Sequence, residues 1–154
     1  MILEFFMEME PPTATAQEKK VSIVHGKPVF YEPTNLKAAK LKLTEQLLQH
    51  KPTEPIDGPI HLEVIWRFPK GKRHKDGEWR ITKPDTDNLQ KMLKDCMTRL
   101  GFWKDDAQVC REAVIKIWTA DQPGIAIGIY SMGKTIYTEE IDDREGRQEV
   151  EFNE

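Results

Sequence analysis

The nine residues from Ile60 to Phe68 constrain the fold most strongly, because apolar and polar side chains alternate along them. Ile60, Leu62, Val64 and Trp66 occupy one face. A period of two indicates a β-strand with one buried face. The backbone of such a strand forms hydrogen bonds with neighbouring strands, and its apolar face must be covered by a second layer of secondary structure.

Two segments with helical spacing are expected to supply that layer. The first begins at Pro33 or Thr34 and repeats apolar residues at Leu36, Ala39, Leu43 and Leu47. The second begins near Asp85 or Asp87 and ends before Gly101, with an apolar face formed by Leu89, Met92, Leu93, Cys96 and Leu100. Both patterns are typical of amphipathic helices packed on a sheet.

The remaining apolar segments read as strands. They cover Ile2 to Met9, a hairpin of Val21 to Val24 with Pro28 to Tyr31, Gln108 to Thr119, and Ile125 to Tyr130. This order predicts a single α+β domain, a mixed sheet with two main helices on one face. We place the domain at residues 1–131 and an acidic, partly disordered tail at residues 132–154.

Composition favours a cytoplasmic protein with no membrane contact. No apolar run approaches the roughly 20 residues of a membrane span, and the acidic start of the chain does not resemble a signal peptide. Cys96 and Cys110 lack the CxxC spacing of a zinc site, so we interpret them as buried free thiols.

Four aspartates flank the second predicted helix. Asp85 and Asp87 precede it, and Asp105 and Asp106 follow its terminal Gly101-Phe-Trp turn. Grouped carboxylates suit a hard divalent cation such as Mg²⁺. One aspartate at a helix start is explained by capping, but a second two residues away adds repulsion that either a metal cation or Lys91 would relieve.

Two other classes of protein contain a D-x-D pattern. A calcium loop of the EF-hand type needs glycine at its sixth position and glutamate at its twelfth, where this chain has Gln90 and Cys96. A D-x-D sugar-nucleotide transferase is disfavoured because the chain shows no clear nucleotide-binding βαβ pattern.

The length of the second predicted helix limits whether Asp106 can lie beside Asp85. A helix from Asp87 to Arg99 is about 20 Å long, and six residue steps from Leu100 to Asp106 span at most about 20 Å. Asp106 therefore meets Asp85 only if the chain runs straight back along the helix. Otherwise the helix is shorter than predicted, or a partner subunit supplies this carboxylate.

Lys91 shares a helix face with Asp87 and Asp95. The structural interpretation is a ladder of ion pairs worth a few tenths of a kcal/mol. The functional interpretation is a cation directed at a phosphate, where it stabilises charge that develops in a transition state.

A basic segment lies directly before these acids. Between Arg67 and Lys83, seven basic residues against two acidic ones give a balance of +5. Eight acids against two arginines between Ile136 and Glu154 give −6, so the net charge of −3 conceals a body of +3. A solvated loop explains the basic segment as well as a nucleic-acid contact does.

The stretch from Lys83 to Val109 resembles the RusA family of Holliday junction resolvases, which is common in phages and prophages. The resemblance is carried by P-D-x-D-N-L-Q-K and by G-F-W-x-D-D-A-Q-V, and it extends more loosely over residues 1–131. It implies a homodimeric endonuclease that cuts four-way DNA junctions symmetrically with Mg²⁺ or Mn²⁺.

The resemblance also implies roles for particular residues. Asp85, Asp87 and Asp106 correspond to metal-binding catalytic acids and Lys91 to a catalytic lysine, with Asp105 as an assisting ligand. The expected DNA contacts are Lys70, Lys72, Arg73, Lys75, Arg80 and Lys83. A non-catalytic junction-binding protein and a flap or fork nuclease of relaxed specificity remain as alternatives.

Overall fold

The computed structural model describes residues 2–15 and 20–138. Its core element is a four-stranded sheet in the order β1-β6-β4-β5. These strands are β1 (Leu3–Glu8), β4 (Ile60–Pro69), β5 (Val109–Thr119) and β6 (Gly124–Ser131). β4 pairs parallel with β5 and antiparallel with β6, which in turn pairs antiparallel with β1. The predicted mixed sheet is therefore confirmed.

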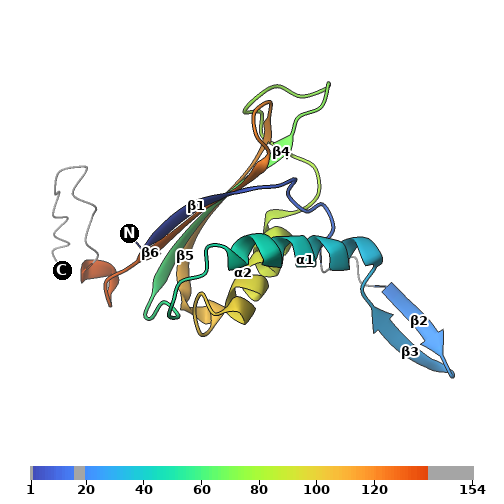
Figure 1. The fold of residues 1–154 in the computed structure, drawn as a ribbon, viewed down its shortest axis with the longest axis horizontal. Coiled ribbons are helices and arrows are strands. Elements are labelled where there is room, and N and C mark those ends of the chain that lie inside the picture. The colour runs from blue at the N-terminus through green and yellow to red at the C-terminus, as the bar shows by residue number, and fades with distance from the viewer. Residues whose placement is uncertain (1, 16–19, 139–154) are drawn as a thin grey trace, which may run out of the picture.

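Two helices, α1 (Thr34–Leu48) and α2 (Thr86–Leu100), cover one face of this sheet (Figure 1). The buried face of β4 contributes Ile60, Leu62, Val64, Trp66 and Phe68 to the core, as the alternation predicts. The helices contribute Leu36, Leu43 and Leu47 from α1 and Leu89, Met92, Leu93, Cys96 and Met97 from α2. Burial of these side chains supplies the main driving force for folding. The prediction of buried thiols is thus confirmed for Cys96 but wrong for Cys110, which is exposed at the register shift between β4 and β5.

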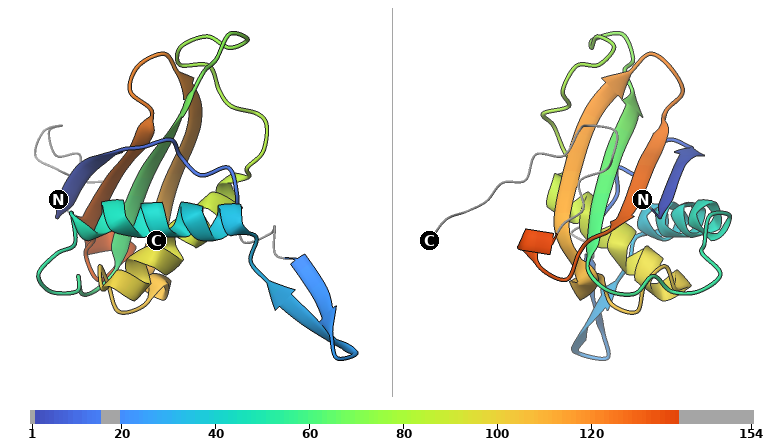
Figure 2. Two further views of the ribbon diagram at one scale, coloured as in Figure 1. Left: turned by 45° about the vertical axis from the view of Figure 1, so that its right-hand side comes forward. Right: turned by 90° about the vertical axis from the view of Figure 1, so that its left-hand side faces the viewer.

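Within the described residues, no helix covers the opposite face of the sheet (Figure 2). Two glycines in β6 leave space on this face for neighbouring aromatic rings. A Cβ at Gly124 would lie 2.3 Å from the Phe6 ring, and one at Gly128 would lie 2.5 Å from the Tyr130 hydroxyl. These two rings therefore lie against a glycine backbone rather than against side chains.

The predicted hairpin is confirmed as β2 (Lys20–Val24) paired with β3 (Lys27–Tyr31). It projects from the body beyond the start of α1 (Figure 1). All its described side chains, from Val21 to Tyr31, are exposed, and Ile23 and Phe30 expose 78% and 72% of their surface.

The end of the described chain is a short 3-10 turn, η3 (Ile136–Thr138). Most of the predicted acidic tail, residues 139–154, lies outside the described residues. None of the helices in the described part is long and apolar enough to cross a membrane.

Candidate active site

The start of α2 presents two aspartates to solvent. Asp85 is the N-cap residue in extended conformation, and its backbone oxygen accepts the Leu89 N–H at 3.1 Å. Its carboxylate makes no capping hydrogen bond, and Asp87 in the first turn is exposed. Both negative charges lie at the positive end of the helix dipole, which stabilises them.

A pocket of about 440 Å³ joins these residues to neighbouring segments. It is lined by Asp85, Asp87, Asn88, Lys83 and Pro84, together with Thr13 and Thr15 from the chain after β1. Sequence reasoning missed the two threonines, since nothing in their local pattern marks them. Thr15 is only 4% exposed, so this segment is packed into the body and forms one wall of the pocket.

Lys116 in β5 is a second residue that sequence reasoning missed. Its Nζ donates to the backbone oxygens of Thr82 and Pro84, both at 2.7 Å. Burial lowers the pKa of Lys116, the nearby Arg80 lowers it further, and the charge of Asp85 raises it. Lys116 thus fixes the backbone directly before Asp85. A lysine between two isoleucines in an apolar strand was the available signal.

Asp105 and Asp106 follow α2 and have different environments. The Asp105 carboxylate caps the 3-10 turn η2 (Asp106–Gln108) by accepting the Ala107 N–H at 2.9 Å. The Gln108 side chain completes this capping box by accepting the Asp105 N–H at 3.2 Å. Asp106 is half-buried, and its carboxylate has no hydrogen-bond partner among the described residues. Of this pair, Asp106 is the acid left available for a ligand.

The two pairs of acids lie at opposite ends of α2, because Asp85 and Asp87 stand at its start and Asp105 and Asp106 follow its C-cap Gly101. The helix has 15 residues and is therefore about 22 Å long. The chain after it does not run back along the helix but enters β5 beside Ile60, at the start of β4. Within the described residues no three His, Cys, Asp or Glu side chains are close enough to hold a metal ion. One chain thus brings Asp85 and Asp87 together and leaves Asp105 and Asp106 apart from them.

Lys91 lies on the exposed surface of α2, one turn after Asp87. In the part of the chain that the structure describes, it forms no ion pair with either Asp87 or Asp95. Its ammonium group is therefore exposed on α2 one helical turn from Asp87.

The basic loop, residues 70–83, is fastened to β5 rather than loose. Gly77 N–H donates to the Trp118 oxygen at 2.8 Å, and the His74 ring stacks on the Trp118 ring at 4.2 Å. Lys72, Arg73, Lys75 and Lys83 are exposed, and Lys70 is half-exposed. Lys83 lines the pocket, and the other cations are held on a defined backbone between β4 and that residue.

Arg80 differs from the other expected DNA contacts. Its guanidinium lies 4.1 Å from the centre of the Phe68 ring and 4.4 Å from that of Trp118, and it donates to the Lys83 oxygen at 2.5 Å. Burial lowers its pKa. Arg80 is thus already held inside the loop, where it supports the backbone that leads to Asp85.

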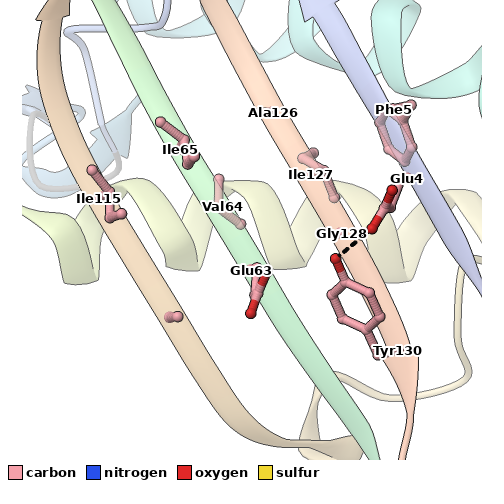
Figure 3. A pocket seen from close by; sticks show the side chains of 11 residues that line it. Glu4, Phe5, Glu63, Val64, Ile65, Ile115, Ala126, Ile127, Gly128 and Tyr130 are labelled. Atoms are coloured by element: carbon pink, nitrogen blue, oxygen red, sulfur yellow. Dashed lines mark hydrogen bonds between the residues drawn. The ribbon is translucent and has the colours of Figure 1, made fainter. Parts of the chain in front are cut away.

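A second pocket, of about 550 Å³, lies on the helix-free face of the sheet (Figure 3). Apolar residues such as Ile65 and Ile115 line most of it, and the Tyr130 hydroxyl donates to Glu4 at 2.8 Å at one side. None of the predicted catalytic residues lines this pocket.

Comparisons with known proteins agree with the resemblance. A family model described as Endodeoxyribonuclease RusA matches residues 10–130, which include every predicted site residue. The chain belongs to the RusA family. It is 33% identical to the crossover junction endodeoxyribonuclease rusA of Lactococcus phage r1t, over 71% of this chain and 83% of that protein.

Two further relatives of this RusA-family protein are informative. The uncharacterized protein YqaN of Bacillus subtilis is 32% identical over 70% of this chain and 82% of its own length. The crossover junction endodeoxyribonuclease RusA of Escherichia coli K12 is 43% identical over 49% of this chain and 54% of its own length. The activity named for this family is thus that of an endodeoxyribonuclease.

Proposed function

We propose that this RusA-family protein is a homodimeric endonuclease that resolves four-way DNA junctions with Mg²⁺ or Mn²⁺. The observation that carries the proposal is the pair of uncapped carboxylates, Asp85 and Asp87, in one pocket at the positive end of α2. The names of the relatives from the Lactococcus phage and Escherichia coli support the choice of substrate.

The donor atoms fit a divalent cation. Asp85 and Asp87 supply carboxylate oxygens, and Asn88 adds an amide oxygen in the same pocket. Oxygen ligands are the preference of Mg²⁺, which commonly uses only one or two carboxylates and fills its other positions with water and phosphate. Bound there, the cation supplies Lewis acidity toward the phosphate and a lower pKa for the attacking water.

The chain's own residues then position and stabilise the reacting phosphodiester. Lys91 places a positive charge beside the pocket and offsets the negative charge that develops on the phosphate oxygens. Lys116 holds the Pro84 carbonyl and so keeps Asp85 in place. The exposed cations Lys72, Arg73 and Lys75 contact backbone phosphates around the crossover, which contributes affinity without sequence preference.

A homodimer accounts for both the paired cuts and the source of the Asp106 carboxylate. A four-way junction has two-fold symmetry and needs two opposed cuts, which a two-fold pair of subunits provides. Asp106 is about one helix length from Asp85 in its own chain, so the partner subunit is the remaining source of this carboxylate. Each site then consists of Asp85, Asp87 and Lys91 from one subunit and Asp106 from the other.

The test is cleavage of an end-labelled synthetic four-way junction beside a linear duplex of the same sequence. Each substrate is incubated with Mg²⁺ and with EDTA, using the wild type and Asp87→Asn. We expect symmetric nicks on the junction alone, only with Mg²⁺, and none from Asp87→Asn, while its junction affinity stays within a few-fold of wild type.

Other results would select a different function. Tight junction binding without cutting in either divalent cation would favour the non-catalytic junction-binding protein. Cutting of flaps or forks at the junction rate would favour a branched-DNA nuclease of relaxed specificity. If Asp87→Asn also loses its circular dichroism spectrum, Asp87 has a structural role instead.

A further inference from the structure

The β2–β3 hairpin presents an apolar face to solvent. Its register pairs Val21 with Phe30 and Ile23 with Pro28. Because side chains alternate along a strand and opposite residues share a face, these four lie together. More than half of the surface of Val21, Ile23 and Phe30 is exposed, and within the described residues none of the three belongs to the hydrophobic core. Single exposed apolar residues need no explanation, but a contiguous apolar face is typical of a binding surface.

The hairpin is an ordered arm. The two residues of its turn, His25 and Gly26, have φ values of 51° and 77°, as a type I′ turn requires. All five residues of β2 pair with β3, and five residues in a strand extend over about 17 Å. At the base of the arm, Glu32 forms an ion pair with Lys40 of α1. The apolar face is thus carried on a paired ribbon that projects beyond the start of α1 (Figure 1).

The arm begins close in sequence to the wall of the Asp85 pocket. Thr15 lines that pocket, and β2 begins at Lys20. The six residue steps from Thr15 to Val21 span at most about 22 Å. Successive phosphates of one DNA strand advance by about 3.4 Å along the helix axis. The apolar face therefore lies within about six base steps of a phosphate bound in the pocket.

The charges of the hairpin favour nucleic acid as its partner. From Lys19 to Tyr31 the sequence contains three lysines and no acid. Lys27 is exposed, and because it pairs with Val24 it lies on the face opposite Phe30. Phosphates attract such a positively charged arm, whereas two copies of the arm repel each other. DNA therefore suits this surface better than a second copy of the same hairpin does.

An apolar face also determines which part of DNA the hairpin can contact. The major groove admits a two-stranded ribbon, but its base edges are read mainly by hydrogen-bond donors and acceptors, which the side chains of this face lack. The flat surfaces of bases instead accept apolar wedges and aromatic rings. In a linear duplex, neighbouring base pairs cover these surfaces. At an open four-way branch point, the last base pair of each arm exposes one of them, so the hairpin fits the centre of a junction.

We propose that the β2–β3 hairpin enters the centre of the four-way junction and stacks the Phe30 ring on the end base pair of one arm. This inference rests on the proposed function and assigns the preference for branched DNA to a particular element. Val21 and Ile23 cover the adjoining base surface, while Lys27 on the other face contacts phosphates. Because the stacked ring stabilises only the branched substrate, Phe30 determines specificity and takes no part in the chemical step.

Photocrosslinking tests the stacking directly. 5-Iododeoxyuridine replaces a thymidine at the crossover of one synthetic junction and in the middle of an arm of another. Irradiation joins this base to an aromatic ring stacked on it, and peptide mass spectrometry identifies the residue. The Asp87→Asn protein is used so that the junction stays intact. We expect a crosslink from the crossover to Phe30 and none from the middle of the arm. A bound complex without the crosslink to Phe30 would overturn the proposal.

Affinities for a junction and for a linear duplex test the role in specificity. Phe30→Ser removes the ring and Phe30→Tyr keeps it, while Leu41→Ser removes an exposed apolar side chain from α1 as the matched control. We expect Phe30→Ser to weaken junction binding at least about fivefold, the lower end for loss of one stacked base, and to leave duplex binding within about twofold. Phe30→Tyr and Leu41→Ser should match the wild type on both substrates.

These results separate the inference from the function on which it rests. A wild-type protein that binds junction and duplex equally would refute the proposed function. A preference for the junction that Phe30→Ser leaves unchanged would refute the role of the hairpin alone. A lower molecular mass of Phe30→Ser in light scattering would assign this face to a contact between subunits and would also overturn the proposal. Thermal unfolding is the control for folding, and we expect no change because the hairpin lies outside the core.

Discussion

Asp105 and Asp106 are adjacent in sequence and have the same charge, yet their carboxylates have different environments in the structure. Asp105 uses its carboxylate to cap η2, while the Asp106 carboxylate has no hydrogen-bond partner in the described part of the chain. A capping bond needs an oxygen acceptor but no charge, whereas a cation needs the charge. The same conservative substitution, aspartate to asparagine, can therefore distinguish the roles of the two acids.

We expect Asp106→Asn to lower junction cleavage more than the roughly 10- to 100-fold loss typical of groups that only support a metal ligand. Asp105→Asn keeps the capping oxygen and should retain cleavage within a few-fold. Single-turnover cleavage measures the effect, and thermal unfolding of both variants provides the control. Equal losses of cleavage in the two variants would show that both acids serve the site.

At this scale, the sequence is informative where an excess of one residue type is visible locally. The excess of acid at Asp85 and Asp87 beyond what capping needs was visible in the pattern, and both line one pocket. Thr15 and Lys116 were not visible, because their positions at the pocket depend on contacts with segments distant in the sequence. The catalytic and metal roles themselves stay predictions.

At the scale of elements, the basic loop shows how ordered structure can support exposed charge. Its inner side is held by His74, Arg80 and Asp76, the last through a 2.9 Å bond from the Ala120 N–H. Lys72 and Arg73 lie on the solvent side. In the proposed DNA complex, the loop would therefore contact phosphates without having to become ordered first.

Replacing Lys72 and Arg73 together by alanine should weaken junction binding and reduce the salt dependence of the binding constant. Each lost phosphate contact removes about 0.9 from the slope of log K against log salt, so the expected change is about two. Fluorescence anisotropy over a series of salt concentrations measures it. Replacing Lys37 and Lys42, exposed on α1, is the control with an equal loss of charge. An unchanged slope in the loop variant would exclude this loop from the interface.

The elements themselves were well predicted. β4, α1 and α2 begin and end within about two residues of the expected positions, since strict periodicity with proline and glycine boundaries leaves few alternatives. Their arrangement was less accessible. β5 and β6 are joined by a short turn, which favours direct pairing, yet β4 lies between them. The central position of β4 depends on how β5 and β6 are buried on either side of it. The sequence of a single chain does not reveal this.

At the scale of the whole molecule, the distance between the acids of one chain predicts complementation between defective subunits. Asp87→Asn and Asp106→Asn homodimers should each be inactive. In a mixed dimer, one site receives both substitutions and the other receives neither. Mixing the two proteins after mild dissociation should therefore restore nicking at one wild-type site per dimer.

The restored activity has a distinct product. A mixed dimer cuts one strand of a junction and leaves the opposed strand intact, so nicked junctions accumulate in place of resolved duplexes. Native and denaturing gels of the same reaction distinguish the two. A mixture with no activity would place all the acids of a site in one subunit, since each site of the mixed dimer would then carry one substitution.

The β2–β3 hairpin has a different consequence for this molecule. Its described side chains are all exposed, so it adds nothing to the core on which folding depends. Substitutions there carry little thermodynamic penalty, because surface positions outside special contacts change stability by less than about 0.5 kcal/mol. The hairpin can therefore diverge rapidly among related chains, and its sequence is free to adapt to a new target while the catalytic body is preserved.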